Sequence, residues 1–207
     1  MNQLQGPALS RSGITLYGSP ISGHTHRVQL LLLILGIDFR MIEVPLAERK
    51  LPEFLAMNPL GQIPVLADGD LVLCDSNAIM TYLVRRYAPD SQWMPVDPVG
   101  TARMQRWLSI AAGELAYGIA AARRSGNCAD GERARVIALR VLPVMEQHLA
   151  THAFLAAGHP TLADLACYPY LAVAPEAGLP LAPYPHVRAW IGRLEALPRF
   201  KPMPRRP

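Results

Sequence analysis

Apolar and polar positions switch between strand-like and helix-like patterns in the first part of the chain. Residues 14–18 form a short β-prone run that stops at the turn-forming pair Ser19-Pro20. Residues 25–35 are heavily apolar and compatible with a helix, and Gly36 is placed to end it. Residues 39–44 alternate and predict a second strand. A strand, a helix and a strand in this order predict a βαβ unit with a parallel strand pair.

The pattern continues with a short helix at residues 52–57 and a loop at 58–61. Two apolar runs, 64–67 and 71–74, flank the turn Asp68-Gly69-Asp70 and predict a β-hairpin. Asp75-Ser76 is placed to cap a helix that runs to about residue 88. The predicted order of elements is therefore βαβαββα, an α/β domain.

A change of pattern follows this domain. Three prolines, at positions 89, 95 and 98, fall within ten residues and predict a linker. Beyond them only helix-like segments occur, at 101–122, 131–151, 162–174 and 186–197. We therefore expect an extension at 1–12, an α/β domain at 13–88, a linker at 89–98, an all-helical domain at 99–200 and a basic tail at 201–207.

Charge and composition narrow the classes of function. The net charge of +4 comes from four basic residues among the last nine, since the remaining 16 basic residues balance the 16 acidic ones. A neutral body with a short basic tail, expected to be solvated, does not indicate nucleic-acid binding. The most apolar run, residues 30–35, is far shorter than the roughly 20 residues that span a bilayer.

The start of the chain and its cysteines point to the cytoplasm. The first 12 residues lack the apolar core and cleavage site of a secretory signal. The three cysteines are widely spaced and form no CxxC pair, so neither a zinc site nor a dithiol redox motif is indicated. Reduced thiols in a cytoplasmic protein fit this pattern best.

Two hydroxyl-bearing positions are candidates for binding an anion at a helix N-terminus. Ser22 lies between the first strand and the first helix, where free N–H groups and the helix dipole stabilise negative charge. A thiolate bound there would have its pKa lowered from about 8.5 toward 7 or below. Ser76, after Asp75, is placed to form a carboxylate-binding nest at the next helix start. For each serine, an ordinary helix cap is the competing interpretation.

Two further segments complete a possible site. Gln62-Ile63-Pro64 opens a strand, and a cis bond before Pro64 would turn the backbone of Ile63 outward to pair with an extended peptide. Arg49 and Lys50 are candidates for binding a ligand carboxylate, although solvated surface charge is the simpler interpretation of this pair alone. Together these features fit a tripeptide with a central thiol and two terminal carboxylates.

The order of these motifs resembles the cytosolic glutathione transferase superfamily, from residue 14 to about 200. The matching segments are 17–22 (YGSPIS) with Arg27-Val28, 58–66 (NPLGQIPVL), 73–79 (LCDSNAI), 161–164 (TLAD) and 184–190 (YPHVRAW). The resemblance implies a thioredoxin-like N-terminal domain, an all-α C-terminal domain and a capping box at Thr161 and Asp164. It also implies serine-type chemistry, similar to the phi and theta classes and their bacterial relatives.

The resemblance further implies an activity and its partners. Ser22 is expected to hydrogen-bond the glutathione thiolate, which attacks a small apolar electrophile; Ser19 is the alternative hydroxyl, farther from the helix start. Ile110, Glu114 and Tyr117 are the expected lining of the electrophile pocket. Disulfide or peroxide reduction and non-catalytic glutathione binding are the alternatives. The resemblance also implies a homodimer, for which Met80, Tyr82 and Leu83 are candidate contacts.

Several features stay open at this point. We expect glutathione as co-substrate and no further cofactor. The pair His24 and His26 invites a metal interpretation, but residues two apart on a helix do not face each other, so no metal is expected. The sequence leaves open the natural electrophile, the role of His24, and the functions of the N-terminal extension and the basic tail.

Overall fold

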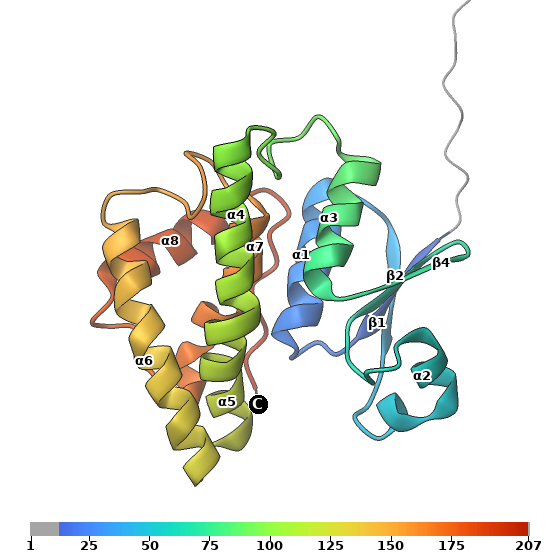
Figure 1. Cartoon of the computed structure of the whole chain (residues 1–207), viewed down its shortest axis with the longest axis horizontal. Coiled ribbons are helices and arrows are strands. Elements are labelled where there is room, and N and C mark those ends of the chain that lie inside the picture. Colours follow the sequence, from blue (N-terminus) through green and yellow to red (C-terminus); the bar gives the residue numbers. More distant parts are fainter. Residues whose placement is uncertain (1–12, 207) are drawn as a thin grey trace, which may run out of the picture.

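The structure is a computed structural model that describes residues 13–206. It consists of a four-stranded sheet with helices on both faces, followed by a bundle of helices beside the sheet (Figure 1). The expected extension at residues 1–12 lies outside the described residues, as does Pro207.

The sheet has the strand order β2-β1-β3-β4. Its strands are β1 (Ile14–Gly18), β2 (Phe39–Glu43), β3 (Val65–Asp68) and β4 (Leu71–Cys74). The parallel pairing of β1 with β2 and the β3–β4 hairpin confirm the predicted βαβαββα order. β1 is a central strand, paired with β3 on its other side, and its almost unbroken apolar run fits burial on both faces.

One face of the sheet packs on α1 (Gly23–Leu35) and α3 (Ser76–Tyr87), which lie side by side in Figure 1. α1 also contacts α7 of the helical bundle, so almost all of its sides are buried. This burial explains why residues 25–35 show no polar stripe. Gly36 ends α1 in the left-handed region, with φ 68°, as predicted.

The opposite face is covered by α2 (Pro52–Met57), preceded by the 3₁₀ turn Glu48–Lys50 (Figure 1). A small separate core lies beneath α2, formed by Val44, Phe54 and Val65. The main core is shared between the sheet's other face and the helical bundle.

The helical part begins at α4 (Pro98–Ile110), capped by Asp97. It continues without interruption through the π-helical segment η2 (Ala111–Ala120) and α5 (Ala121–Ser125). The single helix predicted at 101–122 therefore has a change of helical period in its middle. The chain then forms α6 (Ala129–Leu149), α7 (Leu162–Ala172), the 3₁₀ turn η3 (Ala174–Ala177) and α8 (Pro185–Glu195). Among residues 13–206, none of the helices has the length and apolarity needed to cross a membrane.

The predicted capping box at Thr161 and Asp164 is present at the start of α7. Asp164 is completely buried, and its carboxylate accepts hydrogen bonds from the Thr161 backbone N–H and hydroxyl, the Leu155 N–H and the Trp190 indole. Burial raises the pKa of this carboxyl group. Asp164 thereby links α7, the preceding loop and α8.

Two expectations from the sequence are wrong in the structure. Met80 and Leu83 are fully buried in the chain's own core and are not available to a partner. Tyr82 is half-buried and donates a hydrogen bond to Asp68 at 2.7 Å, and its contact with a partner stays a prediction. The basic tail is not simply solvated, because Met203 is buried and its N–H donates to the Tyr168 hydroxyl. The apolar side chain of Met203 fixes this segment against the helical part.

Candidate functional site

A cleft of about 670 Å³ lies between the α/β part and the helical part. One wall comes from the β1–α1 loop, the segment before β3 and the start of α3. The other comes from η2, α5, α7 and the C-terminal segment. Its lining residues are Ser19, Ile21, Ser22, Gly23, His24, Leu46, Arg49, Gly61, Gln62, Ile63, Asp75, Ala112, Ala116, Tyr117, Ala120, Arg123, Arg124, Pro169, Tyr170, Val173, Met203 and Arg206.

Ser22 is the N-cap of α1 and also lines the cleft. Its hydroxyl accepts a hydrogen bond from the Thr25 N–H at 3.3 Å. The two interpretations of the sequence are therefore compatible, since a capping hydroxyl can also donate its own hydrogen into the cleft. Ser19 lines the cleft too, and its N–H donates to the Thr25 hydroxyl at 3.3 Å. Only Ser22 is the capping residue, where the helix dipole acts most directly.

The close approach of the loop to α1 depends on Gly18. A Cβ atom at this position would lie 2.3 Å from the Thr25 side chain, so a larger residue would push the loop away from the helix. The strand end, the loop and the first turn of α1 thus form one compact unit around Ser22.

The segment before β3 has the predicted backbone. The Ile63–Pro64 bond is cis, and Gln62 and Ile63 line the cleft, whereas Pro64 is buried and does not. Asn58 fixes this loop, because its side chain donates to the Gln62 carbonyl at 2.7 Å and accepts from the Leu60 N–H. The role of Asn58 was not predicted, although an Asn before a proline is a common turn signal.

The start of α3 differs from the expected carboxylate nest. The Asp75 side chain itself accepts hydrogen bonds from the N–H groups of Asn77 and Ala78. Ser76 is buried and absent from the cleft lining, and its hydroxyl contacts His24 at 3.0 Å. Two of the N–H groups and the hydroxyl expected to bind a ligand are thus used within the protein, while the exposed Asp75 faces the cleft.

A chain of polar contacts runs from Ser76 to the helical part through His24. His24 Nδ1 lies 3.0 Å from the Ser76 hydroxyl, and Nε2 lies 3.0 Å from the Tyr170 hydroxyl. Arg27 is fully buried and donates to the Ser76 hydroxyl at 3.4 Å and to the Asn77 side chain at 3.0 Å. Since Arg27 can only donate, the Ser76 hydrogen is free to point to His24 Nδ1. His24 then carries its proton on Nε2 and donates to Tyr170.

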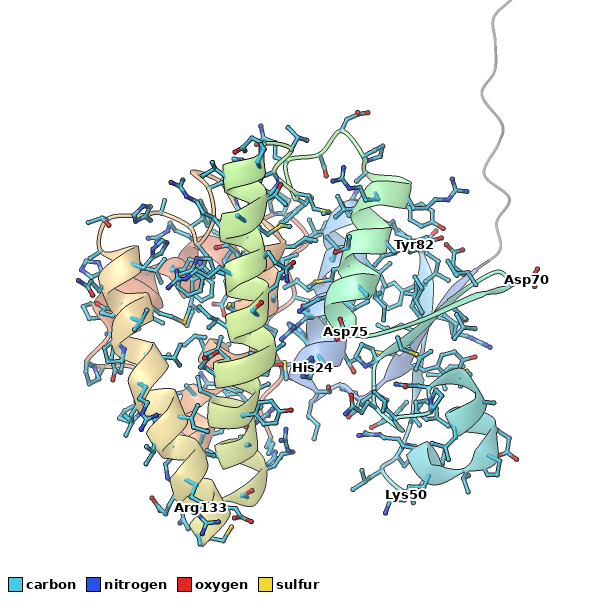
Figure 2. The ribbon with its side chains drawn as sticks, viewed as in Figure 1. His24, Lys50, Asp70, Asp75, Tyr82 and Arg133 are labelled. Carbon is cyan, nitrogen blue, oxygen red and sulfur yellow. The ribbon has the colours of Figure 1, made fainter. Side chains whose placement is uncertain are left out.

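This arrangement fixes the protonation state of His24. Burial, and next the charge of Arg27, lower its pKa from 6.5 to about 3. His24 is therefore neutral at physiological pH. The Tyr170 hydroxyl, which accepts from His24, can direct its own hydrogen into the cleft that it lines. Figure 2 shows His24 at the end of α1 that faces the helical part.

His24 and His26 do not form a pair. The His26 ring is buried and packs near the Tyr168 ring, at 6.1 Å between centroids, away from the His24 contacts. Within residues 13–206, no three His, Cys, Asp or Glu residues lie close enough together to hold a metal ion.

The two cations predicted to bind a carboxylate are separated. Arg49 lines the cleft and donates to the Val44 carbonyl at 3.1 Å. Lys50 is exposed and does not line the cleft; Figure 2 shows it below α2, away from His24. Of this pair, only Arg49 can reach a ligand in the cleft.

The helical wall was only partly predicted. Tyr117 lines the cleft, but Ile110 and Glu114 do not. The lining positions on this helix are instead Ala112, Ala116, Tyr117 and Ala120. These positions follow one another by four, one and three residues and share one side of the helix, which is not the side that carries Ile110 and Glu114.

The C-terminal segment and α5 contribute a group of arginines. Arg123, Arg124 and Arg206 all line the cleft. Arg123 donates to the Ile21 carbonyl at 3.0 Å and pairs with Glu176 at 2.7 Å, while Arg206 donates to the Arg123 carbonyl at 2.6 Å. These residues could not be predicted as a group, because no local pattern shows that residues 123 and 206 meet.

Family comparisons agree with this architecture. Residues 16–91 match the family described as "Glutathione S-transferase, N-terminal domain", and residues 104–198 match "Glutathione S-transferase, C-terminal domain". Glutathione S-transferase 3 of Zea mays is 35% identical over 204 residues, covering 91% of each chain.

Solved structures give the same result. A glutathione S-transferase from Pseudomonas fluorescens superposes with a TM-score of 0.86 at 31% identity, covering 93% of this chain and 99% of its own. A glutathione transferase homologue from Drosophila mojavensis, with bound glutathione, has a TM-score of 0.81 at 27% identity, covering 90% of this chain and 89% of its own. This chain belongs to the glutathione S-transferase family of transferases.

Proposed function

We propose that this protein transfers glutathione to small electrophiles with an apolar body, using Ser22 to stabilise the glutathione thiolate. The observation that carries the proposal is the position of Ser22, which caps α1 and faces a cleft whose opposite wall is largely apolar. The Ser22 hydroxyl donates to the sulfur, and the helix dipole lowers the thiol pKa.

Glutathione would lie along the α/β wall of the cleft. The Ile63 backbone is placed to pair with the peptide, and Arg49 is placed to bind a carboxylate. Of the described residues that line the cleft, Asp75 alone has a carboxylate side chain, which makes it the natural partner of the glutathione amino group. These contacts would hold the sulfur near Ser22.

The reaction is a nucleophilic substitution or addition. In the substitution, the thiolate forms a C–S bond with the electrophilic carbon, and the leaving group departs with the bonding electron pair. Positioning of the two reactants and stabilisation of the thiolate supply the rate enhancement. The second substrate would contact Ala116, Tyr117 and Ala120 on the helical wall.

A panel of three assays with glutathione tests the function. The substrates are 1-chloro-2,4-dinitrobenzene, a hydroperoxide and a mixed disulfide. We expect conjugation of the first to dominate. If reduction of the peroxide or disulfide dominates, the enzyme is a glutathione-dependent reductase; binding with no turnover would indicate a non-catalytic binding protein.

The role of Ser22 is tested with Ser22→Ala and, as its matched control, Ser19→Ala. Because Ser22 is proposed to act on the thiolate, its loss should lower kcat more than it raises the glutathione KM, and should move the pH–rate profile to higher pH. If Ser19→Ala produces these changes and Ser22→Ala does not, the assignment of Ser22 is wrong.

We also infer a cytoplasmic location. The three cysteines are free: Cys128 is exposed, Cys74 is half-buried and Cys167 is buried. A reducing compartment, which also supplies glutathione, is consistent with these thiols.

A further inference from the structure

We propose that the electrophile bound by this cleft carries an anionic oxygen group, such as a carboxylate or sulfonate, which the arginines at positions 123, 124 and 206 recognise. The inference rests on the proposed function and specifies the class of its second substrate. Among residues 13–206, the cleft lining contains four arginines and one carboxylate side chain, and of these arginines only Arg123 has an ion-pair partner, Glu176, which lies outside the lining.

The three arginines belong to the helical wall, whereas Arg49 belongs to the wall proposed for glutathione. Arg123 and Arg124 are in the last turn of α5, and Arg206 follows in the C-terminal segment. The hydrogen bond from Arg123 to the Ile21 carbonyl places this group directly beside the loop that carries Ser22. An anion held here would therefore be close to the reacting sulfur.

The structural roles of Arg123 leave part of its guanidinium group unused. Only 6% of the residue is exposed; Nε pairs with Glu176 and Nη1 donates to Ile21. Within residues 13–206, the buried Nη2 atom has no hydrogen-bond partner. A buried donor without an acceptor is costly. Because Nη2 is shielded in the structure, a ligand oxygen would satisfy it only after a shift of the neighbouring side chains.

Arg124 and Arg206 add charge that the protein does not neutralise. Both are exposed, and neither forms an ion pair with a carboxylate of the described chain. The Arg206 guanidinium group donates to the Arg123 backbone carbonyl, which anchors it to the last turn of α5, next to Arg124. A helix C-terminus favours cations, which partly explains the two arginines of α5, but it does not explain Arg206.

The remainder of the helical wall suits an apolar body. Ala116, Ala120, Val173 and Met203 lie among the lining residues with the arginines. The cleft thus offers an apolar surface with a cationic end, and guanidinium groups bind carboxylates and other oxyanions through paired N–H donors. An aromatic or aliphatic electrophile with one acidic substituent matches both parts.

The first test measures binding with two matched ligands, S-benzylglutathione and S-(4-carboxybenzyl)glutathione. By calorimetry we expect the carboxylated ligand to bind about tenfold more tightly, as hydrogen bonds to a charged group suggest. The double variant Arg124→Gln with Arg206→Gln should abolish most of this preference. Arg133→Gln is the matched control, since Arg133 is exposed at the distant start of α6 (Figure 2) and should keep the wild-type ratio.

The second test measures turnover with 1-chloro-2,4-dinitrobenzene and 4-chloro-3,5-dinitrobenzoate, which react with a thiolate by the same loss of chloride. The ratio of kcat/KM for the anion to kcat/KM for the neutral substrate, at saturating glutathione, should fall about tenfold in the double variant. Added salt should lower the same ratio in the wild type, since the two arginines are exposed.

The results separate this inference from the proposed function. Equal affinity for the two ligands in the wild type, or an unchanged preference in the double variant, overturns the anion site. If the double variant loses as much affinity for glutathione itself as for the carboxylated ligand, the arginines bind glutathione, and the anion site for the electrophile is overturned. Failure to conjugate either electrophile overturns the proposed function, while the calorimetric ratio still decides the anion preference.

Discussion

Removal of the Asp164 carboxylate tests how much one buried group contributes to the helical part. Asp164→Ala leaves three buried N–H donors without their acceptor, those of Thr161, Leu155 and the Trp190 indole. Each unsatisfied donor costs about 1–3 kcal/mol. The burial that raises the pKa of the carboxyl group also means that its removal returns part of the desolvation cost.

We therefore expect Asp164→Ala to lower the free energy of unfolding by about 3–6 kcal/mol, a large part of the roughly 5–15 kcal/mol typical of a domain. Asp164→Asn should cost about half as much. Its remaining oxygen can still accept from Leu155 and Trp190, but its amide group would face the Thr161 N–H donor.

Urea unfolding, followed by tryptophan fluorescence, measures these differences, because Trp107 and Trp190 are buried in the helical part. Asp97→Ala is the matched control. It removes an exposed aspartate cap, which accepts from Gly100 at 2.8 Å, and should cost only about 1 kcal/mol. Equal effects of Asp164→Ala and Asp97→Ala would refute the reasoning, since burial would then make no difference.

Three further results are expected. Asp75→Asn should weaken glutathione binding about tenfold in calorimetry, because the variant keeps the helix cap but loses the charge. Ser76→Ala should mainly lower the stability of the protein. If Ser76→Ala instead weakens glutathione binding and Asp75→Asn does not, the carboxylate nest expected from the sequence is correct. Burial lowers the pKa of His26 from 6.5 to about 4, so its contribution to stability is complete above pH 6.5 and decreases by up to about 3 kcal/mol as the pH falls to 4. His26→Phe should flatten this decrease in urea titrations, and an unchanged pH dependence would contradict the assignment. Light scattering at micromolar concentration should give about twice the 22.7 kDa chain mass if the homodimer implied by the family resemblance forms, and a fully active monomer would exclude it.

Structural features that depend on residues close together in the sequence could be predicted, and contacts between distant residues could not. Local patterns predicted the four strands, the Gly36 helix end and the cap at Asp75, because each depends on neighbouring residues. The Asp164 capping box was also predicted, since its two members are three residues apart. The contact of Asp164 with Trp190 was not predicted, as it joins separate helices.

Local motifs also predicted only part of the cleft. Ser22 and Ile63 were recognised from local motifs, and both line the cleft. His24 could be given no role, because its partners are 52 and 146 residues away in the sequence. Ile110 and Glu114 do not line the cleft, because the sequence of this helix does not show which of its sides faces the α/β part.

The contacts of His24 have a consequence for recombining the two halves of the protein. His24 belongs to the α/β part, and its neutral ring joins Ser76 of that part to Tyr170 of α7. In a chimera with a helical part from another family member, His24 would keep its second hydrogen bond only if that part placed a hydroxyl group where Tyr170 has one. Without it, a buried imidazole N–H would lack an acceptor at the boundary of the cleft. Compatibility between exchanged halves is therefore decided at this histidine as well as by the shape of the surfaces that meet.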